Sequence, residues 1–237
     1  GWLTDVSGPV CVLWSGILLI FCVLLSAQAL KPSLSLSSSG SSSLHKASSS
    51  GIPRKAVLVY LVVFFLWASN GTLYSFLSIH LANLGWSGAK ISLAWNIGVI
   101  AEVLLFIFFG AFERRATLGF WFRFSVYCTV CRWLLMSAIS SELGIYCVQL
   151  LHAFSFAAFH ITSLKLIFHL LPERYRDRGQ GMLIGVGPGL GALCGRLLAG
   201  WQGDLLGAGQ PLYELFAVAA GIAAVAGVLA VFVRDRK

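Results

Sequence analysis

Long apolar runs separated by short polar segments are the dominant pattern along this chain. A helix needs about 20 apolar residues to cross the hydrocarbon of a bilayer. Because no water reaches that layer to satisfy open backbone groups, each run of this length is predicted to form a spanning helix. Seven runs qualify, at about 9–30, 56–82, 91–112, 117–139, 144–170, 182–203 and 211–233. The sequence therefore predicts an all-α integral membrane protein with about seven transmembrane helices.

The composition agrees with this pattern and excludes several classes of protein. Of 237 residues, 58% are hydrophobic and only 11% are charged, whereas soluble domains carry roughly 25% charged residues. This excludes a soluble enzyme domain and a disordered chain. It also excludes a nucleic-acid-binding module, which needs basic residues gathered on one surface. We expect a lipid bilayer as the surroundings, no enzyme activity and no cofactor.

The serine-rich stretch between the first two runs is predicted to be a flexible linker. Serine occupies 11 of the 18 positions from Ser33 to Ser50. The stretch lacks the apolar residues that would offset the entropy lost on ordering.

The basic residues are distributed unequally between the two sides of the predicted membrane. If the helices alternate in direction, 13 of the 17 Lys and Arg residues lie on the side of the linker and the C-terminus. Only Lys90 lies on the opposite side, and three residues lie inside spans. By the positive-inside rule, the serine-rich linker and the C-terminus are expected to be cytoplasmic. We expect the membrane to be the plasma membrane.

A short repeat suggests how the helices are organised. The segment GWLTDVSG at 1–8 recurs as GWQGDLLG at 200–207, with four of eight positions identical. Both copies precede a span that runs inward, as expected for two parallel six-helix halves of a major facilitator transporter. On this interpretation, residues 1–30 are the last helix of the N-terminal half, 31–54 are the cytoplasmic linker, and 55–237 are the C-terminal six-helix domain. The rest of the N-terminal half is expected to be missing from the sequence.

Three ionisable residues are predicted to lie together near the middle of the bilayer. Counting about 1.5 Å per helical residue from the outer helix ends places Glu102 about 16 Å deep, Arg132 about 10 Å and His152 about 12 Å. Ionisable groups inside hydrocarbon are costly and usually face a cavity or a partner, so each is a functional candidate. The structural alternative is a buried Glu102–Arg132 pair with His152 as a packing residue.

Several segments resemble one branch of a known transporter family. LYSFLSIHLANLGWSGAKISLAWNIGVIAEVLLF (73–106), CRWLLMSAI (131–139), QLLHAFSFAAFH (149–160) and the glycine-rich 179–200 stretch are similar to the phenylpropionate-permease-type branch of the major facilitator superfamily. That branch is related to the lactose-permease and nucleoside-symporter groups, which are proton-coupled symporters.

The resemblance implies roles for the three ionisable residues. Glu102 would bind and release the coupled proton. Arg132 would bias that proton or pair with an anionic substrate, and His152 would hydrogen-bond substrate or relay the proton.

Polar and aromatic residues at helical spacing predict a substrate cavity around this layer. Such a cavity suits a small amphipathic solute, such as an aromatic acid, a sugar or a nucleoside. The candidate cavity residues are Asn70, Tyr74, Trp95, Asn96, Gln149 and His160. No metal site is expected, because Cys128 and Cys131 lie inside a span without a second CxxC motif. Lys165, near a helix end, is expected to extend towards the membrane surface.

The glycine-rich segment 179–200 predicts close helix packing. Glycines at 181, 185 and 189 and at 187, 191 and 195 form two ladders of small residues at four-residue spacing, which permit close approach of a neighbouring helix. Pro188 is expected to kink the helix.

The sequence as a whole predicts a secondary active transporter that works by alternating access, with proton symport. Its expected partners are a small-molecule substrate, protons and the missing N-terminal half. Two alternatives stay open: a seven-helix receptor, which shares the topology, and a non-transporting homologue that acts as a sensor.

Overall fold

The computed structural model describes residues 53–207, 209 and 211–233. By compactness the chain divides into two units, Gly1–Gly51 and Ile52–Lys237, and all described residues belong to the second. The predicted helix at 9–30, the serine-rich stretch 33–50 and the first copy of the repeat lie outside the described residues.

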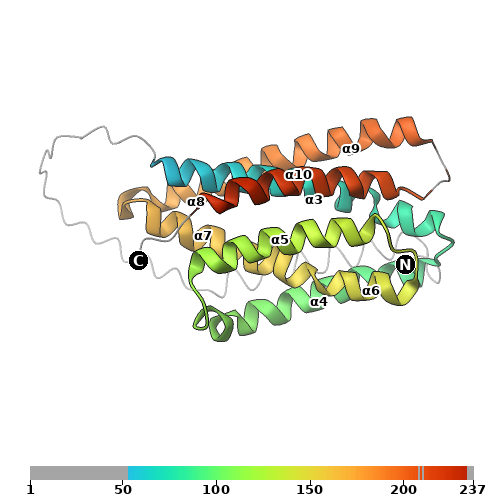
Figure 1. Cartoon of the computed structure of the whole chain (residues 1–237), viewed down its shortest axis with the longest axis horizontal. Coiled ribbons are helices and arrows are strands. Elements are labelled where there is room, and N and C mark those ends of the chain that lie inside the picture. Colours follow the sequence, from blue (N-terminus) through green and yellow to red (C-terminus); the bar gives the residue numbers. More distant parts are fainter. Residues whose placement is uncertain (1–52, 208, 210, 234–237) are drawn as a thin grey trace, which may run out of the picture. The chain divides into compact units, whose positions relative to one another are not determined.

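Every apolar run predicted from residue 56 onward forms helix (Figure 1). Four runs are single α-helices: α3 (Arg54–Asn83), α4 (Gly88–Glu113), α5 (Leu118–Met136) and α10 (Tyr213–Val231). The fifth run consists of α6 (Glu142–Leu150), the π-helical segment η1 (Ala153–Ala158) and α7 (Phe159–Leu170). The sixth comprises the 3₁₀ turn η2 (Glu173–Tyr175), α8 (Arg176–Ile184), the π-helical segment η3 (Gly185–Gly191) and α9 (Ala192–Leu206). The prediction of an all-α architecture is therefore confirmed for the described residues.

Five of these six runs are long and apolar enough to cross a membrane. The run outside this group is α5, whose sequence carries two arginines, Arg123 and Arg132, among its aromatic residues. Helix α5 nevertheless lies inside the bundle and packs against α10, α7 and η1. The described part of the chain is thus a multi-pass membrane domain.

The helices lie side by side along one common direction (Figure 1). Helix α10 packs against both α3 and α5, α9 and η3 pack against α3, and α4 packs against α6 and η1. The main core includes Leu66 on α3, Trp133 on α5 and Phe216 on α10, all fully or almost fully buried. The Trp133 and Phe216 rings are stacked with their centroids 6.0 Å apart, so the core joins three helices.

His80, which no sequence pattern singles out, joins α3 to the start of α10. Its ring is fully buried, and its Nδ1 accepts a hydrogen bond of 2.9 Å from the backbone N–H of Leu212. Leu212 is the N-cap residue of α10, a position whose neighbouring N–H groups lack partners within the helix. The rings of Tyr213 and Phe216 meet His80 edge-on. This contact fixes where the last helix begins.

One of the two predicted glycine ladders is an interhelical contact. A Cβ atom on Gly195 would lie 1.9 Å from the carbonyl oxygen of Ala68, and one on Gly191 would lie 2.6 Å from that of Phe64. A Cβ on Gly187 would lie 2.6 Å from the Trp67 ring. The prediction of close approach is therefore confirmed for this ladder, whose partner is α3.

The second ladder has open surroundings in the described part of the chain. No atom there lies within 4 Å of a Cβ placed on Gly181 or Gly185, and the only atom within that distance for Gly189 belongs to its own helix. Pro188 lies in the π-helical segment η3, where a backbone without an N–H breaks the regular hydrogen-bond ladder.

Replacing Gly195 with alanine should destabilise the domain. Because the new methyl group meets the backbone of Ala68 rather than a flexible side chain, the two helices must separate, at a cost of about 1–3 kcal/mol. Gly200→Ala on the same helix is the control, since a Cβ there meets nothing within 4 Å. Thermal unfolding of the purified protein in detergent measures both. Equal melting temperatures for the two variants would contradict the close contact.

Candidate functional site

Arg132, His152 and Glu102 form a continuous chain of polar contacts across three helices. Arg132 on α5 is 1% exposed, and its Nη1 lies 2.9 Å from Nδ1 of His152. On the other side of the imidazole, His152 Nε2 lies 3.3 Å from Oε2 of Glu102 on α4. The three candidates thus lie together, as the depth estimate predicts, with His152 between the other two.

The geometry determines which nitrogen of His152 carries the proton. A guanidinium N–H can only donate, so Nδ1 of His152 must accept from Arg132. In a neutral imidazole Nε2 is then the protonated nitrogen and donates to the Glu102 carboxylate. A second proton on His152 would place two donors against each other at Nδ1. The arrangement therefore requires a neutral His152 between the Arg132 guanidinium and the carboxyl group of Glu102.

Gln149 and Trp133 hold the Arg132 guanidinium in place. Nη2 of Arg132 donates a hydrogen bond of 2.7 Å to Oε1 of Gln149, and the guanidinium carbon lies 4.9 Å from the centre of the Trp133 ring. Trp133 is held in turn, because its indole N–H donates to Ser69 Oγ at 3.1 Å. The cation is thus held at both terminal nitrogens, and its buried Nε–H has no hydrogen-bond partner within the described residues.

A π-helical turn begins immediately after His152. The segment η1 (Ala153–Ala158) follows it, and α4 and α5 both pack against this segment. π-Helical turns are rare and occur frequently at functional sites, where they break the regular 3.6-residue periodicity. Here the turn separates α6, which carries Gln149, from α7, which carries His160.

Two of the predicted cavity residues form a partly exposed aromatic pair beside the chain of contacts. Tyr74 on α3 stacks on Trp95 on α4, with centroids 6.1 Å apart and an angle of 21°. The indole N–H of Trp95 donates to Ser78 Oγ at 3.0 Å. The pair therefore links the two helices and presents apolar rings.

The remaining predicted cavity residues have different surroundings. Asn70 is buried and its amide donates to the carbonyl of Leu66 in its own helix at 2.9 Å. Asn96 and His160 are exposed, and His160 stacks on Phe156 with centroids 6.4 Å apart. Gln149 contacts Arg132, as described above. The structure thus joins Gln149 to the ionisable residues, and places Asn70, Asn96 and His160 apart from them.

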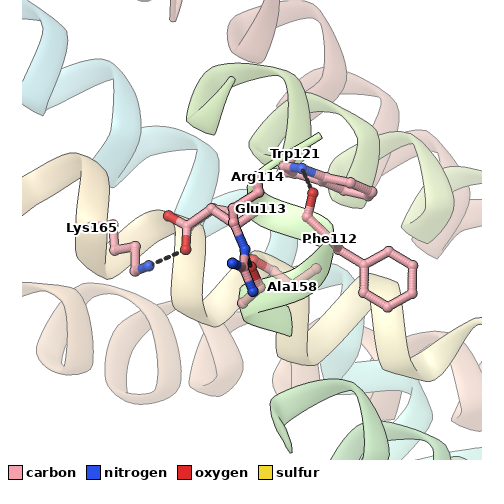
Figure 2. A network of polar contacts seen from close by, with 8 residues as sticks. Phe112, Glu113, Arg114, Trp121, Ala158 and Lys165 are labelled. Atoms are coloured by element: carbon pink, nitrogen blue, oxygen red, sulfur yellow. Dashed lines mark hydrogen bonds and ion pairs between the residues drawn. The ribbon is translucent and has the colours of Figure 1, made fainter. Parts of the chain in front are cut away.

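Lys165 extends to the end of α4, where its ammonium group meets a carboxylate. Its Nζ forms an ion pair with Oε2 of Glu113 at the end of α4, as Figure 2 shows. Just beyond Glu113 the chain turns into α5, where the Trp121 indole N–H donates to the carbonyl of Phe112 at 3.1 Å. These contacts tie α7 and α5 to the end of α4. A nearby carboxylate offers the ammonium group a better partner than lipid does.

A double-mutant cycle should detect the Glu113–Lys165 pair. Removing each charge alone and both together, with Glu113→Gln and Lys165→Met, is expected to give a coupling energy of about 0.5–1 kcal/mol. The Lys90–Glu142 pair at the opposite end of the bundle is the matched control. Its side chains are 50% and 43% exposed, against 42% and 32% for Lys165 and Glu113.

Chemical unfolding in detergent measures both cycles. The control pair should show the smaller coupling because solvent screens it more. A larger coupling for Lys90–Glu142 would contradict the structural role given to Lys165.

Comparison with known proteins shows which family this chain belongs to. The family model described as "MFS_1 like family" matches residues 1–211. A curated relative from Escherichia coli (strain K12), named "Probable 3-phenylpropionic acid transporter", is 29% identical over 105 residues, which cover 44% of this chain and 28% of the relative. The crystal structure of a mutant of the nucleoside transporter NupG matches with a TM-score of 0.64 at 15% sequence identity, over 77% of this chain and 49% of NupG.

The matched region spans less than half the length of each of these two relatives. The likeness to NupG, at 15% identity, concerns the fold alone. The family-model match covers most of the chain, so the resemblance to major facilitator transporters is confirmed, and the alternative of a seven-helix receptor is wrong. The relatives are transporters, which are not enzymes. The chain belongs to the MFS_1-like family of major facilitator superfamily transporters.

Proposed function

We propose that this chain contains the C-terminal half of a secondary active transporter that moves an aromatic carboxylate together with a proton by alternating access. Residues 1–30, 31–54 and 55–237 are then the last helix of the first half, the linker and the six-helix second half. The observation that carries the proposal is the buried chain Arg132–His152–Glu102.

The coupling follows from charge balance in a medium of low polarity. With Glu102 ionised, the negative charge at one end of the chain offsets the Arg132 cation at the other. A substrate carboxylate that binds there would leave one negative charge in excess, which is costly to bury. Protonation of Glu102 removes that charge, so the anion and the proton bind favourably only together. By linkage, each raises the affinity for the other by the same factor.

The substrate class follows from the same site and from its surroundings. The guanidinium of Arg132 suits a carboxylate, and the stacked Tyr74–Trp95 pair offers an aromatic surface. The name of the curated relative, a 3-phenylpropionic acid transporter, points to the same class. Sugars and nucleosides carry no charge for Arg132 to pair with. Of the residues predicted to line the cavity, Gln149 acts as a positioning residue for Arg132. Asn70, Asn96 and His160 do not contact the ionisable residues and are left out of the proposed binding site.

The proposed orientation places the C-terminus and the linker in the cytoplasm of a plasma membrane. Outside the three residues inside spans (Arg132, Lys165 and Arg196), eight of the nine described Lys and Arg residues lie at one end of the bundle, with Lys90 at the other. The positive-inside rule assigns the basic end to the cytoplasm.

Glu102→Gln should separate binding from coupling. Glutamine mimics the protonated carboxyl group, so this variant should exchange 3-phenylpropionate across liposome membranes but fail to accumulate it when a pH gradient is imposed. Its affinity for the substrate should also no longer depend on pH. Both properties are measured with radiolabelled substrate and the complete transporter that contains this chain.

Glu142→Gln is the control, since this carboxylate lies at the helix end and pairs with Lys90. It should accumulate substrate like the unmodified protein. Accumulation by Glu102→Gln would contradict the proton-carrying role. If the unmodified protein exchanges a nucleoside or a sugar but no aromatic acid, the substrate class is wrong.

A further inference from the structure

An apolar groove runs along the outside of the bundle between α5 and α10. The two helices lie side by side (Figure 1). The groove has a cavity volume of about 390 Å³, within the range of about 300–1,000 Å³ that ligand sites occupy. Its walls include Tyr127 and Val130 on α5, and Gly227, Val228, Val231 and Phe232 on α10 or directly after it. The Tyr127 phenol is the one polar group among these side chains.

The groove lies on the face of α5 opposite the ionisable chain. Helix α5 is a regular α-helix from Leu118 to Met136, so successive residues lie about 100° apart around its axis. Arg123, Tyr127 and Val130 follow each other at four and three positions and share one stripe. Arg132 comes five positions after Tyr127, which places it about 140° round the helix from that residue. The groove is therefore not an extension of the proposed transport site.

The contact between Tyr127 and Gly227 shapes the groove. A Cβ on Gly227 would lie 3.2 Å from the Tyr127 ring, and the phenol donates to the Gly227 carbonyl at 3.4 Å. The ring thus lies against the backbone of α10. Val228 and Phe232 are 64% and 62% exposed. Because lipid chains are as apolar as these side chains, lipid is the expected surrounding of this face.

The groove has the length of one lipid leaflet. Seven residues separate Arg123 from Val130 on α5, and eight separate Ala224 from Phe232, which corresponds to about 10–12 Å on each helix. One leaflet provides about half of the 30 Å of hydrocarbon in a bilayer. Phe232 and Arg123 lie at the basic end of the bundle, where α5 begins and α10 ends. The groove therefore extends inward from one membrane surface, along the direction of an acyl chain.

Arg123 places a cation at the surface end of the groove. Its Nη1 donates a hydrogen bond of 2.7 Å to the carbonyl of Val233, the residue that follows the wall residue Phe232. None of the ion pairs within the described residues includes Arg123. A guanidinium has five N–H donors and binds phosphate through two of them at once. The groove thus combines an apolar channel with a donor group suited to a phosphate.

We propose that this groove binds an anionic phospholipid from the leaflet at the basic end of the bundle. The phosphate lies against Arg123, and one acyl chain lies along Tyr127 and Val228. The apolar walls would accept the chain of any phospholipid. The guanidinium favours a headgroup with net negative charge, because the ammonium group of a zwitterionic headgroup already offsets its own phosphate. This site is separate from the transport reaction and does not depend on it.

Native mass spectrometry of the complete transporter in detergent tests the site, with phosphatidylglycerol and phosphatidylcholine of identical acyl chains as probes. The unmodified protein should bind one phosphatidylglycerol about fivefold more tightly than phosphatidylcholine. Arg123→Gln should remove this preference and leave the affinity for phosphatidylcholine within about twofold, which also shows that the variant is folded. Val228→Trp fills the groove and should weaken both lipids about tenfold, as expected when about two methylene groups lose their burial.

Two variants at exposed positions outside the groove are the matched controls. Arg115→Gln removes a basic charge at the same end of the bundle, and Leu197→Trp adds an indole to α9, where Leu197 is 66% exposed. Both should bind the two lipids as the unmodified protein does. Equal losses of phosphatidylglycerol binding in Arg123→Gln and Arg115→Gln would show a general surface attraction and overturn the site. Unchanged lipid binding by Val228→Trp would overturn it too.

The other possible occupant of the groove is a second copy of the chain. In native membranes, Val228→Cys should therefore form no more disulfide-linked dimer on oxidation than the unmodified protein, whose own cysteines provide the background. Additional dimer through position 228 would show that protein covers the groove and would overturn the lipid site.

Discussion

The burial of one guanidinium group is the constraint on which the polar interior of this domain depends. Arg132 is 1% exposed, and an isolated cation in such surroundings would cost far more than any single packing contact contributes. Residues from three helices stabilise it. Gln149 on α6 and His152, just beyond the end of α6, contact the guanidinium directly, and Trp133 on α5 lies beside it. Glu102 on α4 contacts the imidazole of His152. The site is therefore assembled by helix packing and cannot exist on one helix alone.

The helices on the two sides of the bundle pack through different kinds of contact. On the side of α3, η3 and α9, small residues allow backbone-to-backbone contact, and Gly195 against Ala68 leaves no room for even a methyl group. On the side of α4, α5 and α7, contacts are made by long polar and aromatic side chains, including the Lys165–Glu113 pair. Close-packed backbones transmit displacement as a unit, whereas side-chain contacts can exchange partners. The ionisable chain lies on the side whose contacts can rearrange.

For the described residues, the sequence was sufficient to predict the helices and the common height of the three ionisable residues along them. The length of each apolar run determines whether it spans a bilayer, and residue counts give height along a helix directly. For that reason Glu102, Arg132 and His152 could be placed in one layer, and the ladder of Gly187, Gly191 and Gly195 could be assigned to close packing.

Which face of each helix meets its neighbours could not be predicted in the same way. The π-helical segments η1 and η3 break the 3.6-residue periodicity that relates spacing to a helix face. The sequence therefore gave no means of predicting that His152 lies between Arg132 and Glu102, that Gln149 binds Arg132, or that Lys165 meets Glu113. The contact of His80 with Leu212 joins residues 132 positions apart, and no local pattern indicates it.

Infrared difference spectroscopy tests most directly the proposal that Glu102 gains and loses the coupled proton. Adding 3-phenylpropionate to the complete transporter should change the absorption of a protonated carboxyl group in the unmodified protein and in Glu142→Gln. The account predicts that this band is absent in Glu102→Gln. A substrate-induced carboxyl band that persists in Glu102→Gln would show that another group carries the proton and would contradict the account.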